Sequence, residues 1–340
     1  MFGEAAESKI YLVIQGTGDQ KILYTYFYTN PSKVLVNGKE KSCTKSCPMD
    51  YDINNVTLIF NDKINSCKFM FFRRNNIIEI DLSNFDTSSV TDMYDMFYNC
   101  YNLKKIEFGN IKTSSVEDMG YLFSYCKSLI SIDISNFDTS SLTNMHSMFS
   151  NCYNLTKIEF GNIKTSSVED MSHLFYNCKN LISIDLSHFD TSSVTNMDCM
   201  FFGCEKIKYI DASSFDTSKV VIMSNLFYGC HNLVSVNVLS FDNSKVTNMW
   251  AIFGDCRSLK YIDIHNFNGK SATIMNKMFY NCTSLIYVNL FNFQGSVLNN
   301  GATLNDMFEN VPNSLTYCTS IDKLKNELDN NYNNLNYNCD

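Results

Sequence analysis

The stretch FDTSSVTDMYDMFYNC at 85–100 decides the fold, because the chain repeats it with few changes. It returns as FDTSSLTNMHSMFSNC at 137–152 and as FDTSSVTNMDCMFFGC at 189–204. Residues 101–152 and 153–204 are nearly the same text, which indicates duplication of a 52-residue unit. A fixed period of this length is typical of a solenoid, and it outweighs chain length as a guide to the number of domains.

A cysteine ends each copy of a shorter repeat of 26 residues, and one methionine and one phenylalanine keep the same step. Each of these cysteines closes an apolar face, so we expect a buried, reduced ladder in which cysteine acts as a small hydrophobic residue. The ladder cysteines are Cys100, Cys126, Cys152, Cys178, Cys204, Cys230, Cys256 and Cys282. Weaker copies precede and follow them, for a total of roughly ten coils.

Each coil has two halves. In NLKKIEFGNI (102–111) apolar and charged residues alternate, which predicts a short strand with one buried face. In TSSVEDMGYLFSYC (113–126) apolar residues recur at helical spacing, and Ser115 before two acidic residues resembles a helix N-cap. This pattern predicts a helix of two to three turns.

The predicted fold is therefore α/β: a curved, right-handed solenoid of about ten 26-residue coils, with a parallel sheet inside and helices outside. We assign 1–52 to a small β-rich N-terminal cap, 53–312 to the solenoid and 313–340 to a C-terminal cap or tail. Strand and turn signals in 9–40 support the first cap, and SIDKLKNELDN (320–330) is expected to be helical.

The run MFYNCYNLKKIEF at 96–108 resembles the signature of BspA-like leucine-rich repeats, and the 26-residue form with DTSSVTDM resembles the DUF285 type. The resemblance covers about residues 65–312. It implies a cell-surface protein, often an adhesin for matrix proteins, host cells or other microbes. A solenoid supports many kinds of binding, so the resemblance alone does not name a ligand.

Composition excludes several classes of protein. The net charge of −8 argues against nucleic acid as a partner, and no apolar run of 18 residues exists to span a membrane. The start, MFGEAAESKI, has neither the basic region nor the apolar core of a signal peptide. The protein is then either cytosolic or a trimmed part of a longer secreted chain.

The cysteines outside the ladder are interpreted separately. If the protein is extracellular, Cys318 and Cys339 are the best candidates for a disulfide, which would close a loop over the last coil. Among Cys43, Cys47 and Cys67 at most one pair can form. Cys199 is expected on the outer helix face as a free thiol.

The outward-facing strand positions form rows on the inner sheet face, and the second half of the array gains tyrosines there. An exposed aromatic row beside Asp and Asn is a candidate surface for a peptide or a glycan, although strand propensity also explains tyrosine. The candidate ligand-binding residues are Tyr209, Tyr261, Tyr287, Asp211, Asp263, Asn237 and Asn289.

No catalytic motif and no metal-ligand spacing appears in the repeats, so we expect neither an enzyme nor a cofactor nor a metal. The main hypothesis is an adhesin-like module at the cell surface or outside the cell that binds an extracellular protein or glycan. The alternatives are a self-associating subunit of a coat or filament and a cytosolic interaction scaffold. Three sequons, at Asn55, Asn154 and Asn281, would be glycosylated only in a suitable secretory pathway.

Overall fold

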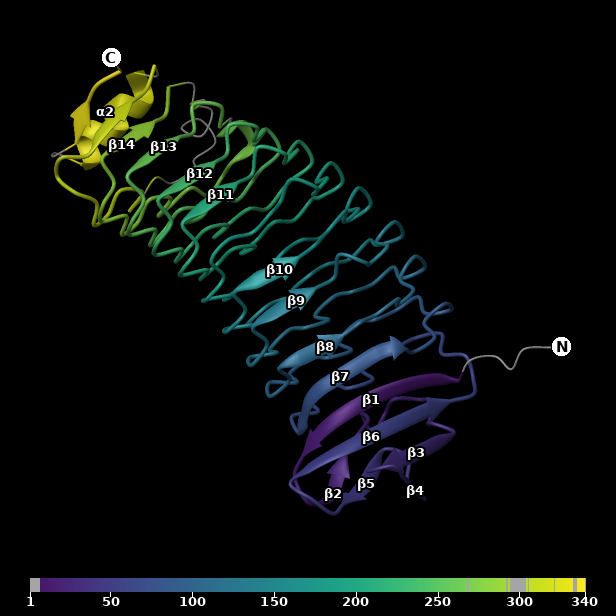
Figure 1. The fold of residues 1–340 in the computed structure, drawn as a ribbon. Helices are drawn as coiled ribbons and strands as arrows, with labels where there is room; N and C mark the ends of the chain where they lie inside the picture. The colour runs from purple at the N-terminus through teal and green to yellow at the C-terminus, as the bar shows by residue number, and fades with distance from the viewer. Residues whose placement is uncertain are drawn as a thin grey trace. The chain divides into compact units, whose positions relative to one another are not determined.

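The computed structural model describes residues 7–267, 269–291, 293, 304, 306–320, 322–332 and 335–339. Residues 1–6, which belong to the segment considered as a signal peptide, lie outside the described residues, as do a few positions of the predicted C-terminal cap. The chain divides into two compact units, unit 1 (Met1–Ile163) and unit 2 (Lys164–Asp340). Both are stacks of the repeated coil (Figure 1).

Unit 1 begins with antiparallel strands, as the alternating apolar pattern of its first residues predicts. These are β1 (Ser8–Gln15), β2 (Gly18–Lys21), β3 (Lys33–Val36), β4 (Lys39–Lys41), β5 (Ser46–Met49) and β6 (Ile53–Phe60). The long strand β1 pairs with β6 on one side and with β7 (Ile77–Asn84) on the other (Figure 1). The antiparallel cap therefore extends through Phe60.

The parallel sheet of unit 1 starts at β7, which pairs with β8 (Lys105–Glu107) so that Ile80 lies opposite Ile106. The next two coils contribute β9 (Ser131–Asp133) and β10 (Lys157–Glu159), which pair in the same parallel sense. Strand β7 thus joins the antiparallel cap to the solenoid. The short parallel strands predicted from the sequence are confirmed.

Unit 2 repeats this arrangement and ends in a small cap. Its elements are β11 (Tyr209–Asp211), β12 (Ser235–Asn237), β13 (Tyr261–Asp263), a 3₁₀ turn (Gly269–Ser271), β14 (Tyr287–Asn289), β15 (Thr316–Cys318), α2 (Asp322–Asn331) and β16 (Asn336–Tyr337). Strands β13, β14, β15 and β16 form one sheet. Helix α2 confirms the helix predicted in the C-terminal segment.

The second half of each coil is a run of tight turns, so the prediction of helices on the outside is wrong. In the coil that ends at Cys100, the Cys100 N–H donates to the carbonyl oxygen of Phe97, three residues back (3.1 Å). The third residue of this turn, Asn99, has φ = 57°, and Asp95 has φ = 56° in the turn before it. A positive φ at this position is the mark of a type II turn and breaks an α-helix.

Alternate N–H groups of these turns bond to the neighbouring coil. The Phe97 N–H donates to the Leu122 carbonyl oxygen (3.0 Å), and the Asn99 N–H donates to the Ser124 carbonyl oxygen (2.7 Å). The turns therefore stack at the same spacing as the strands. The curvature was predicted because helices are wider than strands, and this reason does not apply to a layer of stacked turns.

The turns imitate a helix in sequence because their period of four residues is close to 3.6. Two side chains of every four point inward, which gives the spacing i, i+3, i+4 and i+7 that a helical face also has. The buried set in one coil is Met93, Met96, Phe97 and Cys100. Hydrophobic spacing alone cannot distinguish the two structures.

Identical side chains stack along the core of each unit. The rings of Phe97 and Phe123 lie 5.6 Å apart and nearly parallel in unit 1, and those of Phe227 and Phe253 repeat this in unit 2. The repeated threonines are also buried: the Thr113 hydroxyl donates to the Asp138 carbonyl oxygen of the next coil (3.0 Å). The repeated text is thus explained by packing between coils.

None of the helices in the described part of the chain combines the length and the apolarity needed to cross a membrane.

Candidate functional site

The strands of unit 2 present the predicted tyrosine row on their exposed side, with Tyr209 on the sheet of β11 and β12 and Tyr261 and Tyr287 on the sheet of β13 to β16. In β11 and β13 the outer residues are exposed on either side of a buried isoleucine, so Tyr209 and Tyr261 are 65% and 60% exposed. Tyr287 on β14 is half-buried, and this burial together with the charge of Asp263 raises the pKa of its hydroxyl. The alternation expected for a half-buried strand places all three rings on one face.

The register of the strands sets the spacing of the row. Tyr261 lies directly opposite Tyr287, and Tyr209 lies opposite Ser235 on β12. Parallel strands are about 4.8 Å apart, so Tyr261 and Tyr287 form an adjacent pair. Among the described residues, the hydroxyls of Tyr209 and Tyr261 have no hydrogen-bond partner.

The Asp and Asn row beside the tyrosines has a structural role. Asp211 accepts the Ser213 N–H (3.1 Å), and Asp263 accepts the His265 N–H (3.0 Å), so each side chain closes a turn at the end of its strand. Asn237 and Asn289 accept N–H groups two residues on in the same way. Hydrogen bonds from the Ser213 side chain and backbone lower the pKa of the Asp211 carboxyl. These four residues therefore need no ligand to explain them.

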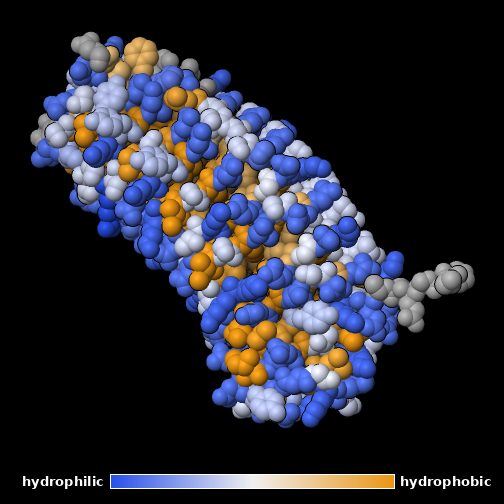
Figure 2. Space-filling model, in the orientation of Figure 1, coloured by the Kyte–Doolittle hydropathy of each residue, from blue (hydrophilic) through white to orange (hydrophobic). Residues whose placement is uncertain are grey.

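Sequence reasoning missed a set of exposed apolar side chains on this face. Val234 and Ile286 immediately precede β12 and β14 and are 36% and 43% exposed, and Ile182, at the equivalent position of a coil without an assigned strand, is 58% exposed. Leu239 and Phe291, just after the strands, are also exposed. A signal was available in the sequence. Lys208 and Lys260 occupy the same repeat position as Ile182 in other coils, and a lysine there indicates that the position is exposed. Figure 2 shows apolar side chains interspersed with polar ones over these strands.

The corresponding face of unit 1 is charged and slightly hollowed. A cavity of about 270 Å³ lies where the cap meets the first coils, with Tyr11, Glu79, Asp81, Lys105 and Glu107 in its lining. The Lys105 ammonium and the Glu107 carboxylate are 2.8 Å apart. Unit 1 thus offers ion pairs where unit 2 offers aromatic rings.

The ladder cysteines are fully buried and reduced. The Cys126 thiol donates to the carbonyl oxygen of Phe97, 29 residues earlier (3.2 Å). The other ladder thiols with a partner among the described residues make the same bond. Burial raises the pKa of Cys100, Cys152 and Cys230 to about 12, so the thiols stay protonated and keep their donor hydrogen. The ladder position therefore favours cysteine for two reasons: its small size, which the sequence indicated, and this hydrogen bond, which the structure adds.

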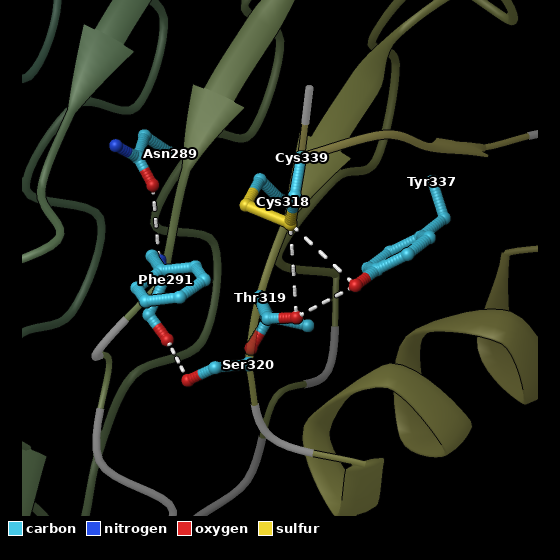
Figure 3. Close-up of a disulfide and its surroundings, with 7 residues drawn as sticks. All are labelled: Asn289, Phe291, Cys318, Thr319, Ser320, Tyr337 and Cys339. Atoms are coloured by element: carbon cyan, nitrogen blue, oxygen red, sulfur yellow. Dashed lines mark hydrogen bonds between the residues drawn. A yellow bond between two sulfur atoms is a disulfide. The ribbon is translucent and has the colours of Figure 1, made fainter.

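Of the remaining cysteines, the structure joins Cys318 to Cys339 and Cys43 to Cys47 in disulfides. Figure 3 shows the first of these at the end of β15, where the Tyr337 hydroxyl also donates to the Thr319 carbonyl oxygen (3.1 Å). The bond ties the end of the chain to the last coil.

Cys67 is a buried free thiol. Cys199 is also free, but it is only 7% exposed, so the expected position on an exposed helix face is wrong. It occupies a turn with φ = 56°.

The three sequons differ in exposure. Asn55 on β6 and Asn154 are exposed. Asn281 is half-buried, has φ = 58°, and its amide donates to Asp255.

The chain belongs to the family described as "Mycoplasma protein of unknown function, DUF285", whose model matches residues 65–159, 153–234 and 200–319. These matches confirm the resemblance to DUF285-type leucine-rich repeats. No curated protein matches the sequence.

Three solved structures are similar to this chain at low sequence identity and with low TM-scores. A leucine-rich cell surface protein from Faecalibacterium prausnitzii is 16% identical, with 80% of this chain and 76% of that chain covered and a TM-score of 0.32. A leucine-rich repeat protein from Bacteroides ovatus is 18% identical, with 93% and 100% covered and a TM-score of 0.28. An LRR protein from Leptospira interrogans is 10% identical, with 76% and 61% covered and a TM-score of 0.27.

Proposed function

We propose that this chain is a non-enzymatic, adhesin-like module at the cell surface or outside the cell, and that it binds an extracellular protein through the sheet face of unit 2. The observation that carries the proposal is the exposure of Tyr209 and Tyr261 on β11 and β13, with hydroxyls that have no hydrogen-bond partner among the described residues. Tyrosines of this kind bury much area at little cost in conformational entropy, which is why they concentrate at binding surfaces.

The neighbours of the tyrosines favour a protein over a glycan. Val234 and Ile286 expose aliphatic side chains next to β12 and β14, and Ile182 does so at the equivalent position of an earlier coil. Such side chains offer no hydrogen bonds to sugar hydroxyls, whereas an apolar patch with a polar rim is typical of a protein interface. The Asp and Asn row supplies that rim, since each side chain has a second polar atom beyond its turn.

The test begins with the purified full chain on an array of extracellular-matrix proteins and a glycan array. The affinity for the strongest protein hit is then compared with that of the triple variant Tyr209→Ser, Tyr261→Ser, Tyr287→Ser. We expect a loss of at least tenfold, because aromatic anchors contribute on the order of 1–2 kcal/mol or more each. The matched control replaces Tyr26 and Tyr51 on the cap, which are 82% and 63% exposed, and should bind normally.

Unchanged binding by a folded triple variant would overturn the proposal, and hits confined to glycans would overturn the choice of a protein ligand. Sedimentation over a concentration series addresses self-association through the same face. Concentration-dependent assembly that the triple variant abolishes would favour the coat or filament subunit instead.

A further inference from the structure

Three consecutive coils of unit 2 bring potential metal ligands into one row. His173, Cys199 and Asn225 occupy equivalent turn positions 26 residues apart, and each has φ = 56°. Asp198 directly precedes Cys199. The stacking of the coils therefore places an imidazole, a carboxylate, a thiol and an amide side by side.

The distances are close to those of a coordination site. One ligand atom each from His173, Asp198 and Cys199 lies within 4.8 Å of the other two. In a tetrahedral zinc site the ligand atoms are separated by about 3.3–3.6 Å, as metal–ligand distances of 2.0–2.3 Å require. Small side-chain rotations close that gap. The backbone is already fixed, since the His173 N–H donates to the Asp198 carbonyl oxygen (2.8 Å).

The surroundings of these three side chains also suit a cation. The Ser224 hydroxyl donates to Asp198 Oδ1 (2.5 Å), which orients the carboxylate as outer partners of metal ligands do. The Asn225 side chain hydrogen-bonds Cys199. The Asn225 Oδ1 atom is buried and, among the described residues, has no hydrogen-bond partner. A buried oxygen without a donor is costly unless something else satisfies it.

Other coils do not repeat this combination. The positions equivalent to Cys199 in the other coils carry Phe69, Asp95, Tyr121, Ser147, Ala251, Lys277 and Asp306. Two of these are aspartates, but a cysteine stands at this position only in the coil of Cys199. The cluster is thus a local departure from a regular array, whereas the ladder cysteines and the core phenylalanines recur in almost every coil. Packing requirements common to all coils do not explain it.

We propose that His173, Asp198 and Cys199 bind one divalent transition-metal ion of the borderline-soft class, zinc foremost. Thiolate and imidazole favour zinc or cobalt over calcium or magnesium, and the two negative charges match a divalent ion. On binding, the Cys199 thiol loses its proton to solvent as the sulfur–metal bond forms. The inference does not depend on the proposed binding function.

The test is a cobalt(II) titration of the metal-free full chain, followed by optical absorption. We expect saturation at one equivalent, with visible bands of tetrahedral cobalt and a thiolate-to-cobalt charge-transfer band in the near ultraviolet. Zinc should displace the cobalt and abolish both signals. Cys199→Ser should lose the charge-transfer band, and His173→Gln should keep it with at least tenfold weaker binding.

The matched control is His265→Gln, since the imidazole of His265 is 2.7 Å from Asp263 Oδ1 in an exposed pair that lacks a cysteine. This variant should titrate like the parent chain. Absence of a thiolate band in the parent chain, or its persistence in Cys199→Ser, would overturn the proposal. If Cys199→Ser fails to fold by circular dichroism, His173→Gln decides, and unchanged cobalt affinity there counts against the site.

Discussion

The exposed sheet faces of the two units differ sharply, although both rest on the same kind of coil. Strands β8 and β10 of unit 1 read Lys-Ile-Glu, with lysine and glutamate paired on the surface. Strands β11 and β13 of unit 2 read Tyr-Ile-Asp. The central isoleucine belongs to the shared core, whereas the two flanking positions vary. The comparison teaches that the coil fixes its inward residues and leaves the outward ones free for binding.

The ends of the strands show how the coil accommodates either glutamate or aspartate at the last strand position. Asp211 closes its strand by accepting the N–H two residues on, but Glu107 and Glu159 are one carbon longer and make no such turn among the described residues. In their coils a glycine takes over: Gly109 and Gly161 have φ of 55° and 59°. A glutamate on the face therefore depends on a glycine behind it.

The largest effect is expected at Gly161. Replacement by alanine would place a Cβ 2.7 Å from the Ser135 carbonyl oxygen in a backbone with positive φ. We expect a loss of about 1–3 kcal/mol in the free energy of unfolding, measured by denaturant titration. The equivalent residue of unit 2, Ser213, should tolerate alanine within about 0.5 kcal/mol. Equal costs at the two positions would refute this difference between the units.

A smaller, pH-dependent effect separates two buried aspartates. Burial raises the pKa of Asp95 in unit 1 to about 7, and Asp95 Oδ1 has no hydrogen-bond partner among the described residues. In unit 2, burial alone would raise the pKa of Asp255, but hydrogen bonds from Arg257, His231 and Asn281 hold it below its usual value. The two carboxyls thus favour opposite protonation states.

The sign of each contribution follows from proton binding. Between its unfolded value and about 7, Asp95 holds more protons in the folded state, so its contribution to stability falls as the pH rises through this window. Asp95→Asn should stabilise the protein at pH 8 by on the order of 1–2 kcal/mol and flatten this dependence. Asp255→Asn should destabilise it at the same pH. Denaturant titrations at pH 5 and pH 8 measure both, and a destabilised Asp95→Asn variant at pH 8 would contradict the assignment.

The smallest effect on stability is expected when a strand of unit 1 is given the outward tyrosine of a unit 2 strand. Lys105→Tyr removes an exposed ion pair, which solvent screens and which therefore contributes little to stability, and introduces a ring that a strand accepts readily. The midpoint of unfolding should stay nearly unchanged. A large loss of stability would show that the outward positions of unit 1 are not free to vary.

The sequence was sufficient to predict the period, the buried set and the parallel strands, because stacking places the same demand on every coil. The sequence was misleading about the turns, because residues such as Asp95, Tyr121 and Lys277 adopt left-handed backbone conformations that cannot be predicted from their residue types. The predicted tyrosine row depended only on strand alternation, so its placement was accessible. The position of the cluster was not accessible, because His173 comes from one coil and Asp198 and Cys199 from the next, and the three residues match no local motif.

The thiol-to-carbonyl bonds of the cysteine ladder bear on how the chain matures. The unfolded chain exposes fourteen cysteines, but the folded chain leaves two disulfides and ten buried thiols. Wrong cross-links can form only before the coils close, because a protonated thiol in the core does not take part in exchange. In an oxidising compartment, the yield of correctly paired protein then depends on the rate of coil stacking relative to the rate of random disulfide formation. Neighbouring coils are close in sequence, and contacts of this kind form quickly. We therefore expect the coils to stack before random disulfides form.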